Sequence, residues 1–87
     1  MAAWGVYLVR CVDRSLYCGV TTDIKKRICA HNSGTGAKYT RARRPVRLVV
    51  YSGDIFTRSE ALHHEWAVKR LRKDRKIKYL KELAKKK

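Results

Sequence analysis

The shortness of the chain constrains its fold more than any other feature of the sequence. A chain of 87 residues hides only about 60–65% of the surface that its unfolded form exposes. We therefore expect a single domain over residues 1–87, with a small core formed from three or four short elements. Hydrophobic residues make up 45% of the chain, close to the globular average, which argues against disorder throughout.

The first half of the chain predicts two strands, a helix and a third strand. Residues 5–12 and 16–20 are rich in β-branched and aromatic types, and the short polar stretch between them predicts a hairpin. A helix is expected over 24–31, because good capping types precede it at 21–23 and Ser33-Gly34 follows it. After a loop over 34–45, residues 46–51 predict the third strand.

The second half of the chain predicts helices only. Thr57 and Glu60 form a capping-box pattern for a helix that ends near residue 72. A basic C-terminal helix and tail, about 74–87, completes a β-β-α-β-α-α order. This order predicts an α+β fold, in which helices flank a small three-stranded, mainly antiparallel sheet.

The length of the hairpin loop decides how two tyrosines are placed. Side chains alternate between the faces of a strand, so a loop with an odd number of residues puts odd-numbered residues of both strands on one face. Tyr7 and Tyr17 then project on the same side, whereas an even loop would separate them. Gly5 and Gly19 lie two positions from these tyrosines, and glycine in a strand marks a close backbone approach or a bend.

The charge of the chain predicts an anionic partner. Twenty-two Lys and Arg stand against seven Asp and Glu, a net charge of +15. Such an excess repels itself in the folded state, and a negatively charged partner relieves the repulsion. Nucleic acid is the first candidate and an acidic membrane surface the second, with a merely basic solvated surface as the plain alternative.

Neither the N-terminus nor the cysteines predict an exported protein. Residues 1–4 have no basic start, and the apolar runs are too short for a signal or a membrane span. Cys11, Cys18 and Cys29 are odd in number and lack Cys-x-x-Cys spacing, which argues against a disulfide framework or zinc knuckle. We expect buried free thiols in a reducing intracellular compartment, the cytoplasm.

Three charged or polar side chains fall within the apolar faces of the predicted helices. Ile24 and Ile28 define the buried face of the first helix, and Arg27 and His31 point toward the same side. The alternative is that the Arg27 side chain extends past the edge of the core to reach solvent, and that His31 is a buried core residue whose ring nitrogens are hydrogen-bonded. In the next helix Glu65 lies four residues after Ala61, and a carboxylate in an apolar stripe needs a partner or a metal.

The alternative for Glu65 is an ion pair with Arg27 or with a neighbouring lysine. His63 and His64 do not make a zinc site with it, because adjacent helix residues do not share a face. Glu60 is already accounted for by its capping role.

These residues together resemble a known enzyme family. Residues 5–7 (Gly-Val-Tyr) and 17–19 (Tyr-Cys-Gly) look like the two halves of the GIY-YIG nuclease signature. Arg27 with His31 and Asn32 resembles the family's Arg-x-x-x-His helix, and residues 64–66 (His-Glu-Trp) resemble its metal-binding glutamate helix. The likeness runs from about residue 4 to 71, and stretches 36–40 and 44–48 are similar to the small stand-alone bacterial members.

The resemblance implies a divalent-metal-dependent endonuclease that hydrolyses phosphodiester bonds in DNA, with repair or recombination as its setting. Glu65 would hold one Mg²⁺ or Mn²⁺ acting as a Lewis acid, and Arg27 would stabilise charge on the phosphate oxygens. Tyr7 would be the general base, assisted by nearby cations. His31 would relay the proton or hold Tyr7, and Tyr17 would position the phosphate. The implied structural motif residues are Gly5, Gly19 and Asn32.

The exposed positive charges predict where a phosphate backbone lies. The expected contacts are Lys38, Arg41, Arg43, Arg44 and Lys69. The resemblance also implies a further functional polar residue, commonly Asn in larger relatives, after the glutamate, and Lys69 is a nearby candidate for it. Single-stranded, duplex and branched DNA all stay open as partners, and RNA is not excluded. The alternative function is a nucleic-acid-binding module that cleaves weakly or needs a protein partner. A membrane-surface role is disfavoured by the modest apolar face of the last helix.

Overall fold

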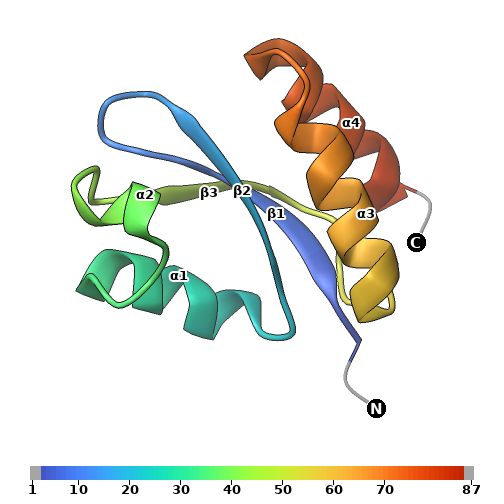
Figure 1. Cartoon of the computed structure of the whole chain (residues 1–87), viewed down its shortest axis with the longest axis horizontal. Helices are drawn as coiled ribbons and strands as arrows, with labels where there is room; N and C mark the ends of the chain where they lie inside the picture. The colour runs from blue at the N-terminus through green and yellow to red at the C-terminus, as the bar shows by residue number, and fades with distance from the viewer. Residues whose placement is uncertain (1–2, 86–87) are drawn as a thin grey trace.

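The computed structural model describes residues 3–85. Residues 1–2 and 86–87, the ends of the expected domain and of its basic tail, lie outside the described residues. In chain order the elements are β1 (Gly5–Arg10), β2 (Leu16–Thr21), α1 (Ile24–Ser33), α2 (Lys38–Arg41), β3 (Arg47–Tyr51), α3 (Arg58–Lys69) and α4 (Lys73–Lys85) (Figure 1). Apart from the one-turn helix α2, this is the predicted α+β order.

The prediction of an uninterrupted loop over 34–45 is wrong at α2. The Thr40 N–H donates to the Ala37 carbonyl at 3.1 Å, and the Arg43 N–H donates to the Thr40 carbonyl at 3.0 Å. No glycine or proline stands within residues 38–41 to prevent this turn of helix. A single turn is too short to produce a helical hydrophobic pattern, so the sequence did not reveal it.

The β1–β2 hairpin has the expected parity. β1 ends two residues earlier than predicted, because the Cys11 N–H already bonds the Ser15 carbonyl at 2.8 Å and Arg14 turns the chain with φ of 70°. Across the hairpin Tyr7 lies opposite Gly19 and Val9 lies opposite Tyr17. The prediction that the two tyrosines share one face is therefore confirmed.

The sheet is wholly antiparallel, with strand order β2-β1-β3. β1 is the central strand, and its first five residues, 5–9, are all buried. β2 is an edge strand, and within residues 3–85 no strand pairs with its outer side. This edge lets elements from both faces of the sheet approach each other around β2.

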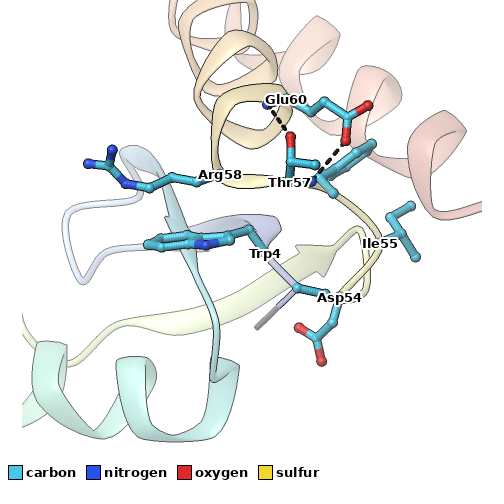
Figure 2. A pocket seen from close by; sticks show the side chains of 8 residues that line it. Trp4, Asp54, Ile55, Thr57, Arg58 and Glu60 are labelled. Carbon is cyan, nitrogen blue, oxygen red and sulfur yellow. Dashed lines mark hydrogen bonds between the residues drawn. The ribbon is translucent and has the colours of Figure 1, made fainter. Parts of the chain in front are cut away.

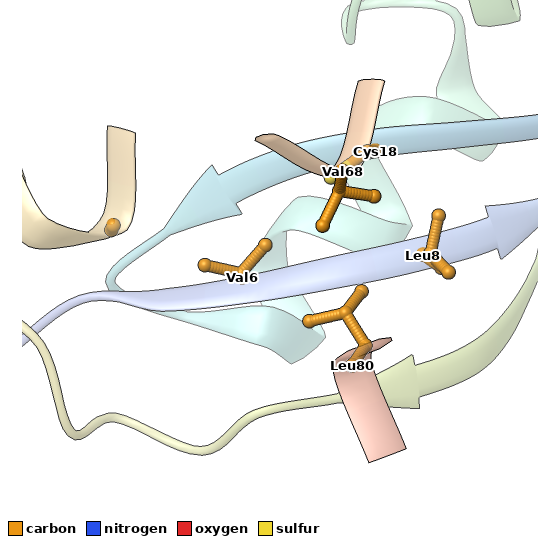
Figure 3. Close-up of a cluster of buried hydrophobic side chains, with 6 residues drawn as sticks. Val6, Leu8, Cys18, Val68 and Leu80 are labelled. Atoms are coloured by element: carbon orange, nitrogen blue, oxygen red, sulfur yellow. The ribbon is translucent and has the colours of Figure 1, made fainter. Parts of the chain in front are cut away.

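Different helices cover the two faces of the sheet (Figure 1). On one face the even-numbered side chains of the hairpin pack with α3 and α4, as the cluster Val6, Leu8, Cys18, Ala61, Val68 and Leu80 (Figure 3). On the other face the odd-numbered side chains meet α1, as the cluster Tyr7, Val9, Tyr17, Ile24 and Ile28. Each fully buried aliphatic side chain contributes about 1.5–3 kcal/mol to folding, so both layers stabilise the position of β1.

Helix α1 is anchored at both ends. The Asp23 carboxylate accepts from the Lys26 N–H at 3.1 Å as the N-cap, and Gly34, with φ of 90°, is the C-cap. Near the C-terminal end, the Asn32 side chain donates to the Val46 carbonyl at 3.1 Å and accepts from the Val46 N–H at 2.7 Å. Asn32 thereby joins α1 to the start of β3.

One expectation about burial is wrong. Cys29 is exposed, because it lies on the solvent side of α1, although Cys11 and Cys18 are buried and all three are free thiols. On α3 the buried residues are Ala61 and Val68, while Trp66 is 60% exposed. The apolar side chains of α3 form two adjacent rows, and only the row of Ala61 and Val68 faces the sheet.

Within residues 3–85 no helix has the length and apolar character needed to cross a bilayer.

Candidate active site

Tyr7 lies at the centre of the candidate site. The side chain is fully buried, and its hydroxyl occupies the space above Gly19 on β2. A Cβ atom built on Gly19 would stand 2.3 Å from the Tyr7 hydroxyl oxygen, so any larger residue would displace the phenol. Gly5 similarly leaves room for Tyr51, whose hydroxyl would be 2.4 Å from a Cβ at that position.

Two side chains of α1 hold the Tyr7 hydroxyl. Arg27 Nε donates to the hydroxyl oxygen at 3.2 Å, and His31 Nε2 lies 2.7 Å from the same oxygen. The spacing of four residues places both side chains on the sheet-facing side of the helix. The inward direction predicted for Arg27 and His31 is therefore confirmed. His31 is also a satisfied core residue, because its Nδ1 lies 2.8 Å from Thr40 Oγ1.

Tyr17 lies against the same group. Its ring centroid is 6.5 Å from that of Tyr7 and 5.6 Å from that of His31. Tyr39 stacks on it with a centroid distance of 5.7 Å and an interplanar angle of 22°. Tyr17 is half-buried, so it forms the boundary between the buried Tyr7–His31 pair and the surface.

Glu65 approaches from the opposite face of the sheet, around the β2 edge. Its side chain is 21% exposed, and the carboxylate pairs with Lys69 Nζ at 3.5 Å. The same Nζ lies 5.3 Å from the centroid of the Tyr17 ring. The structure thus brings Tyr7, Tyr17, Arg27 and His31 into direct contact and connects Glu65 to them through Lys69. The partner of Glu65 is a neighbouring lysine, which was one of the alternatives.

Burial sets the protonation states of Tyr7 and His31. Burial raises the pKa of Tyr7 to about 12, although the hydrogen bond and charge of Arg27 act to lower it. Burial, together with the charge of Arg27, lowers the pKa of His31 below its usual value of 6.5. At neutral pH a protonated phenol therefore faces an uncharged imidazole. Arg27 acts in the expected direction on the pKa of Tyr7, but burial outweighs it in the protein alone.

Glu65 is the carboxylate that the structure connects to the Tyr17 side of the site. Residues 3–85 contain no group of three His, Cys, Asp or Glu side chains that could hold a metal ion by themselves. A single carboxylate fits Mg²⁺ nevertheless, because this ion keeps several waters and is commonly bound by one or two carboxylates and substrate phosphates. Glu65 therefore fits a metal shared with a phosphate, because its ion pair with Lys69 involves only one of the two carboxylate oxygens.

The basic residues near the site differ in how firmly they are held. Arg43 Nε donates to Asp13 at 3.1 Å, and Arg44 Nε donates to the Arg41 carbonyl at 2.9 Å. These two guanidinium groups stabilise the segment around α2. Lys38 and Arg41 lie on α2 with exposed side chains, and they form a positive surface beside Tyr39.

The sequence reasoning did not assign a role to two residues in contact with the site. Thr40 bonds His31, and Tyr39 stacks on Tyr17. Both belong to the stretch 36–40, whose resemblance to a family pattern was the available signal. Their contacts could not be deduced, because they depend on how this segment folds back over α1.

A hollow beside Trp4 is separate from these residues (Figure 2). Its lining includes Trp4, Asp54, Thr57, Arg58 and Glu60, and none of the candidate catalytic side chains. Thr57 and Glu60 bond each other's backbone N–H groups in the predicted capping box. The Arg58 guanidinium lies 5.8 Å from the Trp4 ring centroid. These groups are engaged in local structure, so the hollow indicates no catalytic chemistry.

Comparison with known protein families and sequences gives a consistent result. The family model described as the GIY-YIG catalytic domain matches residues 3–79. A UPF0213 protein of Staphylococcus haemolyticus is 45% identical over 82 residues, which cover 94% of this chain and 99% of that protein. A UPF0213 protein of Desulfotalea psychrophila is 53% identical over 75 residues, covering 85% of this chain and 67% of that protein.

Two solved structures are also similar to this chain. The solution NMR structure of an E. faecalis protein has 42% sequence identity and a TM-score of 0.63, covering 94% of this chain and 86% of that one. The solution NMR structure of a UPF0213 protein of Bacillus halodurans has 42% identity and a TM-score of 0.53, covering 90% and 82%. Both solved structures therefore resemble this chain in sequence and in fold over most of its length.

Proposed function

The chain belongs to the GIY-YIG catalytic domain family, and on that premise we propose that it is a divalent-metal-dependent endonuclease that hydrolyses phosphodiester bonds in DNA. The observation that carries the proposal is the Tyr7 hydroxyl, held by Arg27 at 3.2 Å and His31 at 2.7 Å. A phenol, an imidazole and a guanidinium in contact supply a proton acceptor and a cation for phosphate, which are two requirements of this hydrolysis.

Tyr7 and His31 together activate the attacking water. With a pKa of about 12, Tyr7 does not exist as a free phenolate at neutral pH. Instead, once substrate binding opens a path to the buried hydroxyl, Tyr7 passes its proton to His31 Nε2 while its oxygen takes a proton from the water. The resulting hydroxide attacks phosphorus, and the Arg27 Nε–H stabilises the negative charge that develops on the phenol oxygen.

Arg27 serves the phosphate with its remaining donors. One of its N–H groups is committed to Tyr7, and the planar guanidinium carries four more. Two of these can span two phosphate oxygens, where charge builds up in the transition state. Tyr17, at the boundary with the surface, positions the phosphate group.

Glu65 is the residue that holds the metal. A bound Mg²⁺ or Mn²⁺ supplies a Lewis acid that stabilises the leaving oxygen. Glu65 would hold the ion through its carboxylate, and Lys69, which lies 3.5 Å from that carboxylate, would contact the phosphate backbone. Lys38 and Arg41, exposed on α2, extend this backbone contact.

Repair or recombination of DNA is the proposed cellular setting. The free thiols Cys11, Cys18 and Cys29 support a reducing compartment, and we place the activity in the cytoplasm. The proposed unit of activity is one domain over residues 1–87. DNA is the proposed partner, and RNA is the alternative that the test below includes.

A nucleic-acid-binding module that cleaves weakly, or only with a protein partner, is the second candidate function. The ion pair of Glu65 with Lys69 favours it, because the carboxylate is neutralised before any metal arrives. Strong salt dependence of binding cannot separate the two candidates, since both neutralise phosphates with Lys and Arg.

Cleavage assays on defined substrates separate them. Labelled single-stranded, duplex and branched DNA, and a matching RNA, are incubated with the full chain and Mg²⁺ or Mn²⁺, with EDTA as the control. The nuclease predicts products that require the ion and disappear in Glu65→Gln. Shifted complexes without products under every condition would refute the nuclease and support the binding module.

A further inference from the structure

The two ring nitrogens of His31 have different partners. Nδ1 lies 2.8 Å from Thr40 Oγ1, and Nε2 lies 2.7 Å from the Tyr7 hydroxyl. All three side chains are fully buried. A neutral imidazole carries one N–H, and the hydrogen bonds that its neighbours make decide which nitrogen carries it.

Thr40 acts as an acceptor toward His31. Its only hydroxyl proton is donated to the Ala37 carbonyl at 2.9 Å. The lone pairs of Oγ1 therefore remain for the imidazole, and Nδ1 is the nitrogen that carries the proton. Nε2 is then left with a lone pair directed at the Tyr7 hydroxyl.

The surroundings of Tyr7 favour the same assignment. The Tyr7 oxygen already accepts the Arg27 Nε–H at 3.2 Å, so the phenol proton needs an acceptor of its own. His31 Nε2 provides it at 2.7 Å. In the other tautomer, two N–H groups would point at the phenol oxygen, and the buried phenol proton would lose this acceptor, which is costly.

We propose that Thr40 is a positioning residue that holds His31 in the tautomer able to receive the proton of Tyr7. Thr40 acts through His31 and is not itself placed against substrate or metal. The catalytic consequence rests on the proposed nuclease function, whereas the tautomer of His31 is a property of the protein alone. The two can therefore be tested separately.

NMR of the ¹⁵N-labelled full chain at pH 7.5 reads the tautomer directly. Long-range ¹H–¹⁵N correlations distinguish a protonated ring nitrogen from one with a lone pair, and His31→Gln identifies the His31 signals. We expect the Nδ1–H form in the wild type and in Thr40→Ser, which keeps the hydroxyl. Thr40→Val keeps the shape but removes the acceptor, so we expect a shift toward the Nε2–H form.

Single-turnover cleavage measures the consequence. Loss of a hydrogen-bond partner that orients a metal-bound histidine costs about 10–100-fold. By analogy we expect a fall of that size in Thr40→Val, with near-wild-type rates in Thr40→Ser. The matched control is Thr35→Val, in the segment between α1 and α2, where the exposed hydroxyl contacts Ser33 and the Ala30 carbonyl. We expect no change in that variant.

Three results would overturn the role of Thr40. These are an Nε2–H form in the wild type, an unaltered tautomer in Thr40→Val, and a full cleavage rate in Thr40→Val despite an altered tautomer. The wild-type measurement alone can refute the assignment if Thr40→Val does not fold. If the wild type does not cleave any substrate, the proposed function fails, while the NMR result still decides whether Thr40 positions His31.

Discussion

Replacing Arg27 with lysine separates the charge of this residue from its geometry. In the structure one guanidinium N–H is committed to the Tyr7 hydroxyl at 3.2 Å, and the others remain for phosphate. A lysine keeps the positive charge, but its single ammonium loses the planar fork that serves two partners at fixed positions. If Arg27 were only one of 22 basic residues, the exchange would change almost nothing.

The expected effect is large on cleavage and small on folding. Loss of one well-placed donor for transition-state charge lowers rates by roughly 10²–10³-fold, or about 2.7–4 kcal/mol. The lost bond to Tyr7 costs about 1 kcal/mol of folding free energy, which lowers the melting temperature by about 4–8 °C in a domain of this size. The variant should therefore remain folded at 25 °C and still bind DNA.

Single-turnover rates at saturating protein separate the chemical step from binding. Lys25→Ala is the matched control, because Lys25 lies on the same helix, two positions away, with an exposed side chain. It should weaken binding slightly, without a selective effect on the rate. A wild-type rate in Arg27→Lys would remove Arg27 from the chemistry, and parallel losses of binding and rate would reduce it to a surface charge.

Three further predictions concern the metal, pH and packing. Glu65→Gln should abolish metal-dependent cleavage and leave metal-free binding similar or tighter, whereas Glu60→Gln should cleave normally because glutamine also completes a capping box; equal losses would contradict the assignment. Cleavage should fall as the pH drops through the lowered pKa of His31, because a protonated imidazole cannot accept the Tyr7 proton. The free energy of unfolding should also decrease below pH 6.5, where the unfolded chain binds this proton more strongly; urea titrations at two pH values check this. Gly19→Ala should destabilise the fold by about 1–3 kcal/mol, because its Cβ would stand 2.3 Å from the Tyr7 hydroxyl, and thermal unfolding measures the loss.

Features that depend on neighbours in the sequence were predictable. Thr57 and Glu60 are three residues apart, and they form the capping box that their spacing indicates. The placement of Tyr7 and Tyr17 on one face follows from alternation along two strands joined by a short loop. Arg27 and His31 share a helix face because four residues make about one turn.

Burial on helices was harder to predict. The apolar residues of α3 fill two adjacent rows, and local spacing does not say which row faces the sheet. Trp66 is exposed beside the Arg70 guanidinium, 4.8 Å from its ring centroid, while the smaller Ala61 is buried.

The sequence by itself determined the local elements, the family pattern and the faces on which the candidate residues lie. Only the tertiary structure decided that β2 is an edge strand, around which Lys69 connects Glu65 to the Tyr17 side of the sheet. It also decided that Thr40 meets His31, and that burial outweighs Arg27 in setting the pKa of Tyr7. The physical reason is that strand order and desolvation depend on contacts between residues far apart in the chain, and local spacing carries no information about those contacts.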